Sequence, residues 1–290
     1  MSWRRSFGLL LVGAATVVVV MLVLQATRTS GQGSPTTYRA PRLDGTGAPN
    51  LNGVWQALTT ANWDIQAHAA APSPFPNLLG VYSATAGGPG IIDGTEIPYQ
   101  PWALEQRRKN FENRLKVNPR DVNGSGDPET KCYLPGVPRA TYMPFPFQIV
   151  QSTDTILISY EFADAVRTIF MTKHEPPPID SWMGWSNGRW DGDTLVVDVT
   201  GLIEYSWFDR AGDFHSDALH VVERYTPVTP YHLQYEATIE DPKVFTRPWK
   251  ISLPLYRHIE PNAELSEFKC VPFSEELLYG AFKVEATASR

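Results

Sequence analysis

The stretch from Asp209 to Arg224 carries the densest group of side chains that could transfer protons. A histidine beside a carboxylate is the usual proton-transfer pair, because the carboxylate fixes the imidazole tautomer and raises its basicity. A nearby arginine can hold an anion or an enolate. The sequence therefore predicts acid–base chemistry with five candidate catalytic residues: His215, Asp217, His220, Glu223 and Arg224.

A strand expected over Leu219 to Thr226 must position these groups. Alternate residues of a strand point to opposite faces, so His220 and Arg224 share one face and Glu223 lies on the other. Either His220 and Arg224 enter the inside of a barrel, or Glu223 points inside and pairs with an arginine from a neighbouring strand. Further candidates for the interior are Glu161, Arg167 and Asp198.

Each candidate also has a purely structural interpretation. His215 and Asp217 can order a loop through hydrogen bonds, and Glu223 and Arg224 can form a surface ion pair of under about 1 kcal/mol. Three nearby residues are candidate substrate-binding groups, although the tryptophans can equally pack in the core or across strands. They are Trp190, Asp198 and Trp207.

The sequence predicts no cofactor. The alternative is a metal at His215 and Asp217, because His-x-Asp supplies two ligands of a 2-His-1-carboxylate site, with His220, His232 or His258 as the third. There is no Gly-x-Ser-x-Gly nucleophile motif and no phosphate-binding or dinucleotide-binding glycine loop. The net charge of −6 argues against nucleic acid as a partner.

Short apolar runs rich in β-branched and aromatic residues recur at hairpin spacing after Phe147, and a further run surrounds Trp55. About nine strands in one sheet usually curl into a barrel or split into a sandwich. We therefore expect a mainly β fold, an antiparallel meander that closes into a lipocalin-like barrel or a sandwich, as a single domain over 51–285. Asp191-Gly192 is the strongest hairpin motif in the chain.

One peripheral helix is expected near 101–116. Pro101 suits a first helical turn, and the residues from Ala103 to Lys116 are strong helix formers without glycine or proline. The 25 prolines of the chain mark many turns elsewhere.

The N-terminus predicts export. Arg4 and Arg5 precede an apolar run from Phe7 to Leu24, which is typical of a secretory signal. The run is also long enough to span a bilayer, so residues 1–26 are a cleaved signal peptide or an uncleaved N-terminal anchor. The paired arginines fit the twin-arginine route or the general secretory route. A linker is expected over 27–50, and the protein is periplasmic, secreted or membrane-anchored by this segment.

Cysteine usage agrees with export. Cys132 and Cys270 are the two cysteines of the chain, and an oxidising compartment permits a disulfide between them. Two separate buried thiols are the alternative.

Three motifs resemble a family of uncharacterised exported proteins from soil bacteria. They are Cys132-Tyr-Leu-Pro-Gly-Val-Pro-Arg139, Gly188-Arg-Trp-Asp-Gly-Asp-Thr-Leu-Val-Val-Asp198 and His215-Ser-Asp-Ala-Leu-His-Val-Val-Glu-Arg224. The resemblance implies an exported β-rich domain and brings no activity or catalytic residue with it. Gly53-Val54-Trp55 also resembles the Gly-x-Trp start of lipocalin-like barrels, in which the tryptophan closes one barrel end.

The sequence thus supports three functions of different classes. The first is an exported enzyme of the lyase, isomerase or hydratase type that acts on an apolar or aromatic small molecule by acid–base chemistry. The second is a lipocalin-like protein that binds such a molecule without catalysis. The third is a structural or interaction protein of the cell envelope.

Overall fold

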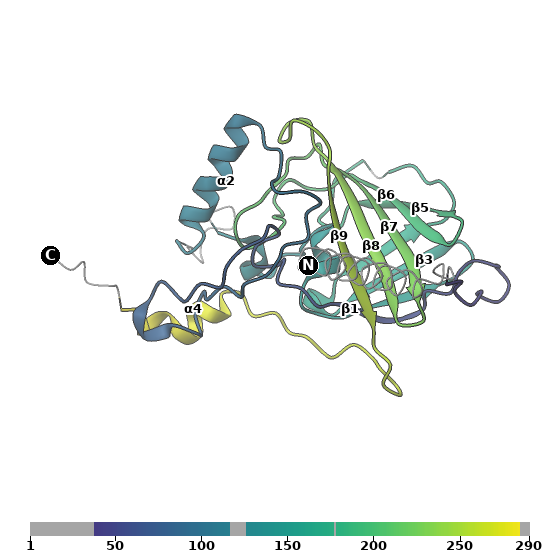
Figure 1. Ribbon diagram of the computed structural model, residues 1–290, viewed down its shortest axis with the longest axis horizontal. Coiled ribbons are helices and arrows are strands. Elements are labelled where there is room, and N and C mark those ends of the chain that lie inside the picture. Colours follow the sequence, from purple (N-terminus) through teal and green to yellow (C-terminus); the bar gives the residue numbers. More distant parts are fainter. Residues whose placement is uncertain (1–37, 117–125, 177, 285–290) are drawn as a thin grey trace, which may run out of the picture. The chain divides into compact units, whose positions relative to one another are not determined.

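The structure is a computed structural model that describes residues 38–116, 126–176 and 178–284 (Figure 1). The predicted signal peptide or anchor over 1–26 and the first part of the predicted linker lie outside the described residues. Within the described ranges, no helix combines the length and the apolar character needed to cross a bilayer.

Nine strands close into one barrel in chain order, with β1 hydrogen-bonded to both β2 and β9. This confirms the mainly β fold and selects the barrel over the sandwich. The strands are β1 (Gly53–Ala57), β2 (Phe147–Gln151), β3 (Thr155–Tyr160), β4 (Val166–Phe170), β5 (Trp185–Asp191), β6 (Thr194–Thr200), β7 (His220–Thr229), β8 (His232–Glu240) and β9 (Trp249–Arg257).

One strand pair departs from the expected antiparallel meander. β4 and β5 run parallel, with Ile169 opposite Ser186, so the chain over 171–184 must return along the barrel instead of making a tight turn. The all-antiparallel prediction is wrong at this pair. The expected hairpin between β5 and β6 is present: Asp191 pairs with Thr194, and Gly192 takes the positive φ of 60° that the two-residue turn needs.

Alternating burial along the strands shows which side chains fill the barrel. On β7, Val221, Glu223 and Tyr225 are fully buried, while the residues between them are only half-buried. Trp55 of β1 is also buried; its indole N–H donates to the carbonyl of Leu51 at 2.9 Å, and the Arg257 guanidinium lies 4.3 Å from its ring centroid. The inner face is therefore lined by side chains that solvent does not reach.

Helices are few and lie outside the sheet. α2 (Pro101–Asn113) confirms the predicted peripheral helix and ends three residues earlier than expected. The other α-helices in the described residues are short, α3 (Arg139–Tyr142) and α4 (Ser274–Tyr279). The part of the chain that the structure describes also contains the 3₁₀ turns η1 (Pro76–Leu78), η2 (Pro128–Lys131), η3 (Phe162–Asp164) and η4 (Gly280–Phe282).

Three connections carry most of the chain outside the barrel: the insertion between β1 and β2, the loop over 201–219 between β6 and β7, and the tail after β9. They pack on one another. The backbone N–H of Arg210 donates to the Asn62 carbonyl at 2.9 Å, and the Asn110 amide donates to the Gly212 carbonyl at 3.1 Å. A Cβ at Gly212 would lie 2.6 Å from that of Asn110, so this close approach requires glycine.

A disulfide fixes the tail to the insertion. Cys132 and Cys270 are bonded, with their Cα atoms 5.7 Å apart, which confirms the predicted pairing. Segments far apart in sequence thus meet in one region outside the sheet, and the clefts described below lie there.

Candidate functional site

The alternation along β7 decides which predicted residues face the barrel interior. Glu223 points inside, whereas His220 and Arg224 lie on the outer face. There His220 contacts Asp198 at 3.1 Å, and Arg224 contacts Asp191 at 2.9 Å. Of the two orientations that the sequence left open, the one with Glu223 inside and paired with an arginine is present, although that arginine is not on an adjacent strand. The alternative with His220 and Arg224 in the lumen is wrong, because Val221 and Tyr225 occupy the inner face with Glu223.

Glu223 lies in a closed network inside the barrel. It forms an ion pair with Arg167 of β4, a strand that is not adjacent to β7 in the sheet, so the pair spans the interior. Tyr225 and Tyr235 donate to the same carboxylate at 3.0 and 2.8 Å. Burial and the charge of Glu223 raise the pKa values of both phenols well above 10. All four side chains are inaccessible to solvent, so they form part of the core.

His215 and Asp217 are separated by their surroundings. His215 is buried; the Ser206 hydroxyl lies 2.8 Å from its Nε2, and the Ser216 carbonyl lies 2.9 Å from its Nδ1. Burial lowers the pKa of His215 below 6.5. Asp217 is exposed and contacts Lys243 at 2.5 Å. The five candidate catalytic residues therefore do not converge on one site, and neither His215 nor Asp217 belongs to a cluster of possible metal ligands in the described ranges.

The three candidate substrate-binding residues also lie in different places. Trp190 of β5 packs against the core. Asp198 of β6 is half-exposed beside His220. Trp207 lines a cleft of about 540 Å³ that is described further below. Of the three, Trp207 alone lies at one of the clefts described here.

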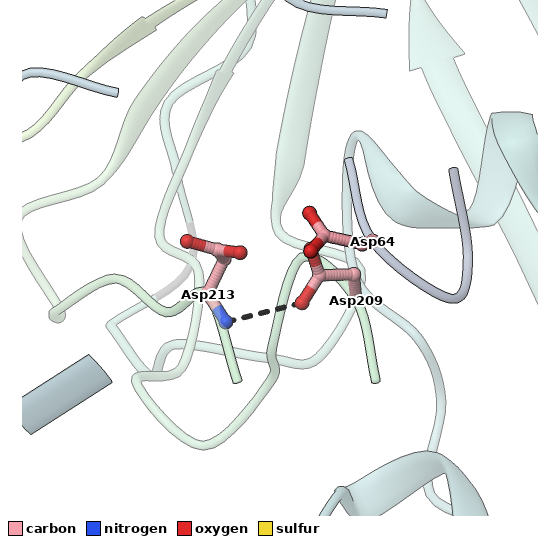
Figure 2. A group of neighbouring side chains, drawn as sticks. All are labelled: Asp64, Asp209 and Asp213. Carbon is pink, nitrogen blue, oxygen red and sulfur yellow. Dashed lines mark hydrogen bonds between the residues drawn. The ribbon is translucent and has the colours of Figure 1, made fainter. Parts of the chain in front are cut away.

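Figure 2 shows three carboxylates that the fold brings together outside the barrel: Asp64, Asp209 and Asp213. One oxygen from each lies within 4.8 Å of the others. Asp209 accepts from the backbone N–H groups of Ile65 at 2.8 Å and Asp213 at 3.1 Å. Asp209 and Asp213 are fully buried, and Asp64 is partly exposed.

Positive and neutral donors balance this acidic cluster. Arg107 of α2 contacts Asp213 at 3.3 Å and Asp64 at 3.5 Å, and the Tyr99 hydroxyl donates to Asp213 at 2.8 Å. Burial, followed by the charge of Asp213, raises the pKa of Asp209 well above its usual range. The same two causes raise the pKa of Asp64. Oxygen ligands at such spacing suit a hard cation, but the cation that the structure places here is the Arg107 guanidinium. The arrangement is a cluster of three carboxyls beside an arginine, in which burial raises the pKa of Asp209 and so favours its protonated form.

A second charged network borders the first. Arg139 is buried and makes two hydrogen bonds to Asp127, at 2.8 and 2.7 Å, and one to Asn62 at 2.9 Å. Arg210 contacts Glu129 at 2.9 Å. The Arg210–Glu129 pair fixes the loop over 201–219 against the insertion, and the Arg139 bonds hold parts of the insertion together.

A cleft with aromatic walls opens beside these networks; we call it the Arg114 cleft. Its larger part has a volume of about 380 Å³ and its smaller part about 220 Å³, and the two share Trp63, Arg114 and Arg210 among their lining residues. Phe145, Phe162 and Phe268 line the larger part, with ring centroids 4.9 to 5.4 Å apart. Asp64 lines the smaller part, which places a carboxyl of raised pKa at the wall of a cavity.

Arg114, which follows the last residue of α2, is the distinctive group of this cleft. Its guanidinium lies 3.8 Å from the centroid of the Phe111 ring, and it donates to the Phe111 carbonyl at 2.7 Å. No carboxylate in the described ranges forms an ion pair with it, in contrast to Arg107, Arg139 and Arg210. Partial burial and the charge of Arg107 lower the pKa of Arg114. An anion in the cleft would stabilise the charged guanidinium and so oppose this lowering of its pKa.

Sequence reasoning found Asp209, Arg210 and Asp213 as part of the acidic run but did not select them, and it missed Asp64, Arg107 and Arg114 altogether. Asp64 is separated from Asp209 by more than a hundred residues, and no pattern within either segment marks the pair. Arg114 lies on a helix that reads as an ordinary charged surface helix.

No protein-family model matches the chain, and no curated protein matches it either. The resemblance to exported soil-bacterial proteins therefore depends on the three motifs alone.

Proposed function

We propose that this protein binds a small molecule with an aromatic or apolar body and a carboxylate group in the Arg114 cleft. The observation that carries the proposal is the guanidinium of Arg114, which lines a cavity and has no carboxylate partner in the described ranges. A planar guanidinium matches a carboxylate bidentately. The expected ligand thus supplies the carboxylate partner that Arg114 lacks, in a cleft whose other lining carboxylates include Glu129 and Glu275.

The walls of the cleft support an aromatic or apolar body for this ligand. Phe145, Phe162 and Phe268 form a continuous ring cluster, and Trp63 lines both parts of the cavity. The volume of about 380 Å³ lies in the range of small-molecule sites. The proposal puts the ligand outside the barrel lumen, because buried side chains such as Tyr225 and Tyr235 occupy the inner face.

Acid–base turnover of the bound molecule is the second candidate, and the position of Asp64 favours it. This carboxyl lines the smaller part of the cleft, and its raised pKa brings it closer to the range in which a group can both take and give a proton. Asp209 is buried next to Asp64 and has a strongly raised pKa, so in this proposal it exchanges the proton with Asp64. This assigns the acid–base role to Asp64 in place of the histidines expected from the sequence.

Binding is tested by calorimetric titration with 1-naphthoate and with its neutral amide, 1-naphthamide. We expect naphthoate to bind and the amide to bind at least about tenfold more weakly, since a hydrogen bond to a charged group contributes about 1.5–3 kcal/mol. Arg114→Gln should remove the preference for the acid. The matched control is Arg108→Gln on the same helix, because Arg108 is exposed and pairs with Glu105 and Glu112. Equal binding of acid and amide, or an unchanged preference in Arg114→Gln, contradicts the proposal.

Turnover is tested separately from binding. The chain is incubated in D₂O with a panel of aromatic keto acids and hydroxy acids, and mass spectrometry measures deuterium incorporation or loss of water. Asp64→Asn should abolish the conversion and retain naphthoate binding within about threefold. If wild-type protein converts nothing while naphthoate still binds at Arg114, the protein is a binding protein without catalysis.

We also propose that the protein is exported by its N-terminal segment. The disulfide between Cys132 and Cys270 supports this location, because such bonds persist in oxidising compartments. Residues 1–37 fused to alkaline phosphatase, an enzyme active only after export, should give activity. Arg4→Lys/Arg5→Lys separates the two routes, since it should block the twin-arginine route alone.

A further inference from the structure

A second cleft, which we call the Trp182 cleft, has one polar wall and one aromatic wall. Four residues of α2 at spacings of three, four and seven form the polar wall, so they lie on one face of the helix. They are Gln106, Lys109, Asn110 and Asn113. The opposite wall holds Tyr133, Trp182, Tyr205 and Trp207. The cavity between the two walls has a volume of about 540 Å³.

The aromatic wall is a connected set of rings. Tyr133 and Trp182 stack with centroids 4.8 Å apart and planes 13° apart, and Tyr205 lies 6.5 Å from Trp182. The disulfide at Cys132 holds the residue next to Tyr133 in place. Tyr205 is 52% exposed. Tyr133 therefore lies face to face with Trp182, and Tyr205 is inclined to Trp182 by 48°, so the rings form an aromatic wall that is still partly open to solvent.

Polar groups at the rings are available for a ligand. The indole N–H groups of Trp182 and Trp207 and the hydroxyls of Tyr133 and Tyr205 have no hydrogen-bond partner in the described ranges. Across the cleft, the Gln106 side chain donates to Asn110 and keeps its own carbonyl oxygen available. The cleft thus offers donors and acceptors together at the edge of an apolar surface.

We propose that the Trp182 cleft binds the pyranose rings of an oligosaccharide. A pyranose carries C–H groups on its flat faces, which pack on aromatic rings, and hydroxyls at its edge, each of which both donates and accepts. The two walls supply these partners separately: rings from Trp182 and Tyr205, and amide groups from α2. A purely apolar ligand would leave the amide wall unpaired. This site is distinct from the Arg114 cleft and does not depend on it.

The test is titration of the full chain with maltotriose, cellotriose, chitotriose and tri-galacturonate, followed by tryptophan fluorescence and calorimetry. At least one neutral trisaccharide should bind with saturation. Tyr205→Ala should weaken it at least about tenfold, and Gln106→Ala at least about threefold. Tyr231→Ala is the matched control, because Tyr231 is equally exposed, at 55%, in the turn between β7 and β8.

Three outcomes overturn the proposal. The first is that none of the four sugars binds, and the second is that binding is unchanged in both Tyr205→Ala and Gln106→Ala. Binding of tri-galacturonate alone also contradicts it, because the charges of Lys109 and of Lys131, which also lines the cleft, would then explain the affinity. A circular dichroism spectrum identical to wild type shows that each variant is folded, and naphthoate binding at Arg114 gives an independent check.

Discussion

The carboxylate of Glu223 and the guanidinium of Arg167 form an ion pair across the inside of the barrel, between two strands that are not neighbours in the sheet. Both side chains are almost completely buried, at 0% and 1% exposure. Ser186 accepts from Arg167 at 2.8 Å, and two tyrosines donate to Glu223. Such a pair tolerates burial because its charges are matched and most of its polar atoms are hydrogen-bonded; within the described residues, Nη1 of Arg167 is the atom of the pair left without a partner.

Glu223→Gln is therefore expected to destabilise the protein by about 3–5 kcal/mol, because it leaves the buried charge of Arg167 unpaired. Urea unfolding followed by tryptophan fluorescence measures the loss. The matched control is Arg224→Gln, the next residue on the outer face, whose exposed pair with Asp191 contributes under about 1 kcal/mol. A loss below 1 kcal/mol in Glu223→Gln would show that the interior pair is not formed.

The barrel and its ion pair show how far local pattern reaches. The alternation of residues along β7 allowed two orientations of Glu223, toward the barrel interior or toward the outside. The burial of Val221 and Tyr225 on the same face shows that Glu223 points inside. The hairpin at Gly192 was predictable because a turn of this kind depends on residues adjacent in sequence. The parallel pairing of β4 with β5 was not, because nothing in the 171–184 segment specifies the direction in which the chain returns.

The candidate sites could not be predicted either, because they too depend on contacts between residues far apart in sequence. Asp64 and Arg107 come from the insertion between β1 and β2, and Asp209 comes from the loop over 201–219; the packing of these two connections depends on long-range contacts such as the one between Gly212 and Asn110. His215 and Asp217 looked like a pair in sequence, yet one is buried against Ser206 and the other is exposed beside Lys243. Proximity along the chain did not predict a shared site.

Asp209 should make stability fall as the pH rises. Its pKa is strongly raised in the folded state, so the folded protein holds a proton that the unfolded chain releases near 3.8. The stabilisation that protonated Asp209 gives to the folded state is fully present below pH 3.8 and is lost as the pH rises toward the pKa of the folded state. Asp209→Asn, which cannot ionise, should flatten that part of the profile. Urea unfolding at a series of pH values measures the slope. An identical slope in the variant would show that Asp209 is ionised in the fold.

His215 should act in the opposite direction. Burial lowers its pKa below 6.5. At acidic pH the unfolded chain therefore binds a proton at His215 that the folded protein does not bind. The contribution of neutral His215 is present above pH 6.5 and is lost as the pH falls through 6.5 toward the folded pKa. Proton NMR titration of the imidazole should give a midpoint below 6.5. His215→Gln should remove the destabilisation on this acidic side, and a midpoint above 6.5 contradicts the burial.

The disulfide should hold the tail and not the barrel. All nine strands precede Cys270, and β9 ends at Arg257, so the sheet closes without the tail. The bond instead fixes Phe268 and its neighbours against the insertion, where they line the Arg114 cleft.

The double variant Cys132→Ser/Cys270→Ser is expected to keep the far-ultraviolet circular dichroism spectrum of wild type. Its chain over 258–284 should become open to rapid proteolysis, and its affinity for naphthoate should fall at least about tenfold. Mass spectrometry of the fragments locates the cuts. In the chain-entropy model, removing a disulfide that closes a loop of 138 residues costs up to about 5 kcal/mol of stability. The double variant is therefore compared with wild type at a temperature well below its unfolding transition. Cleavage within the strands themselves, or an intact tail, would contradict this division between barrel and tail.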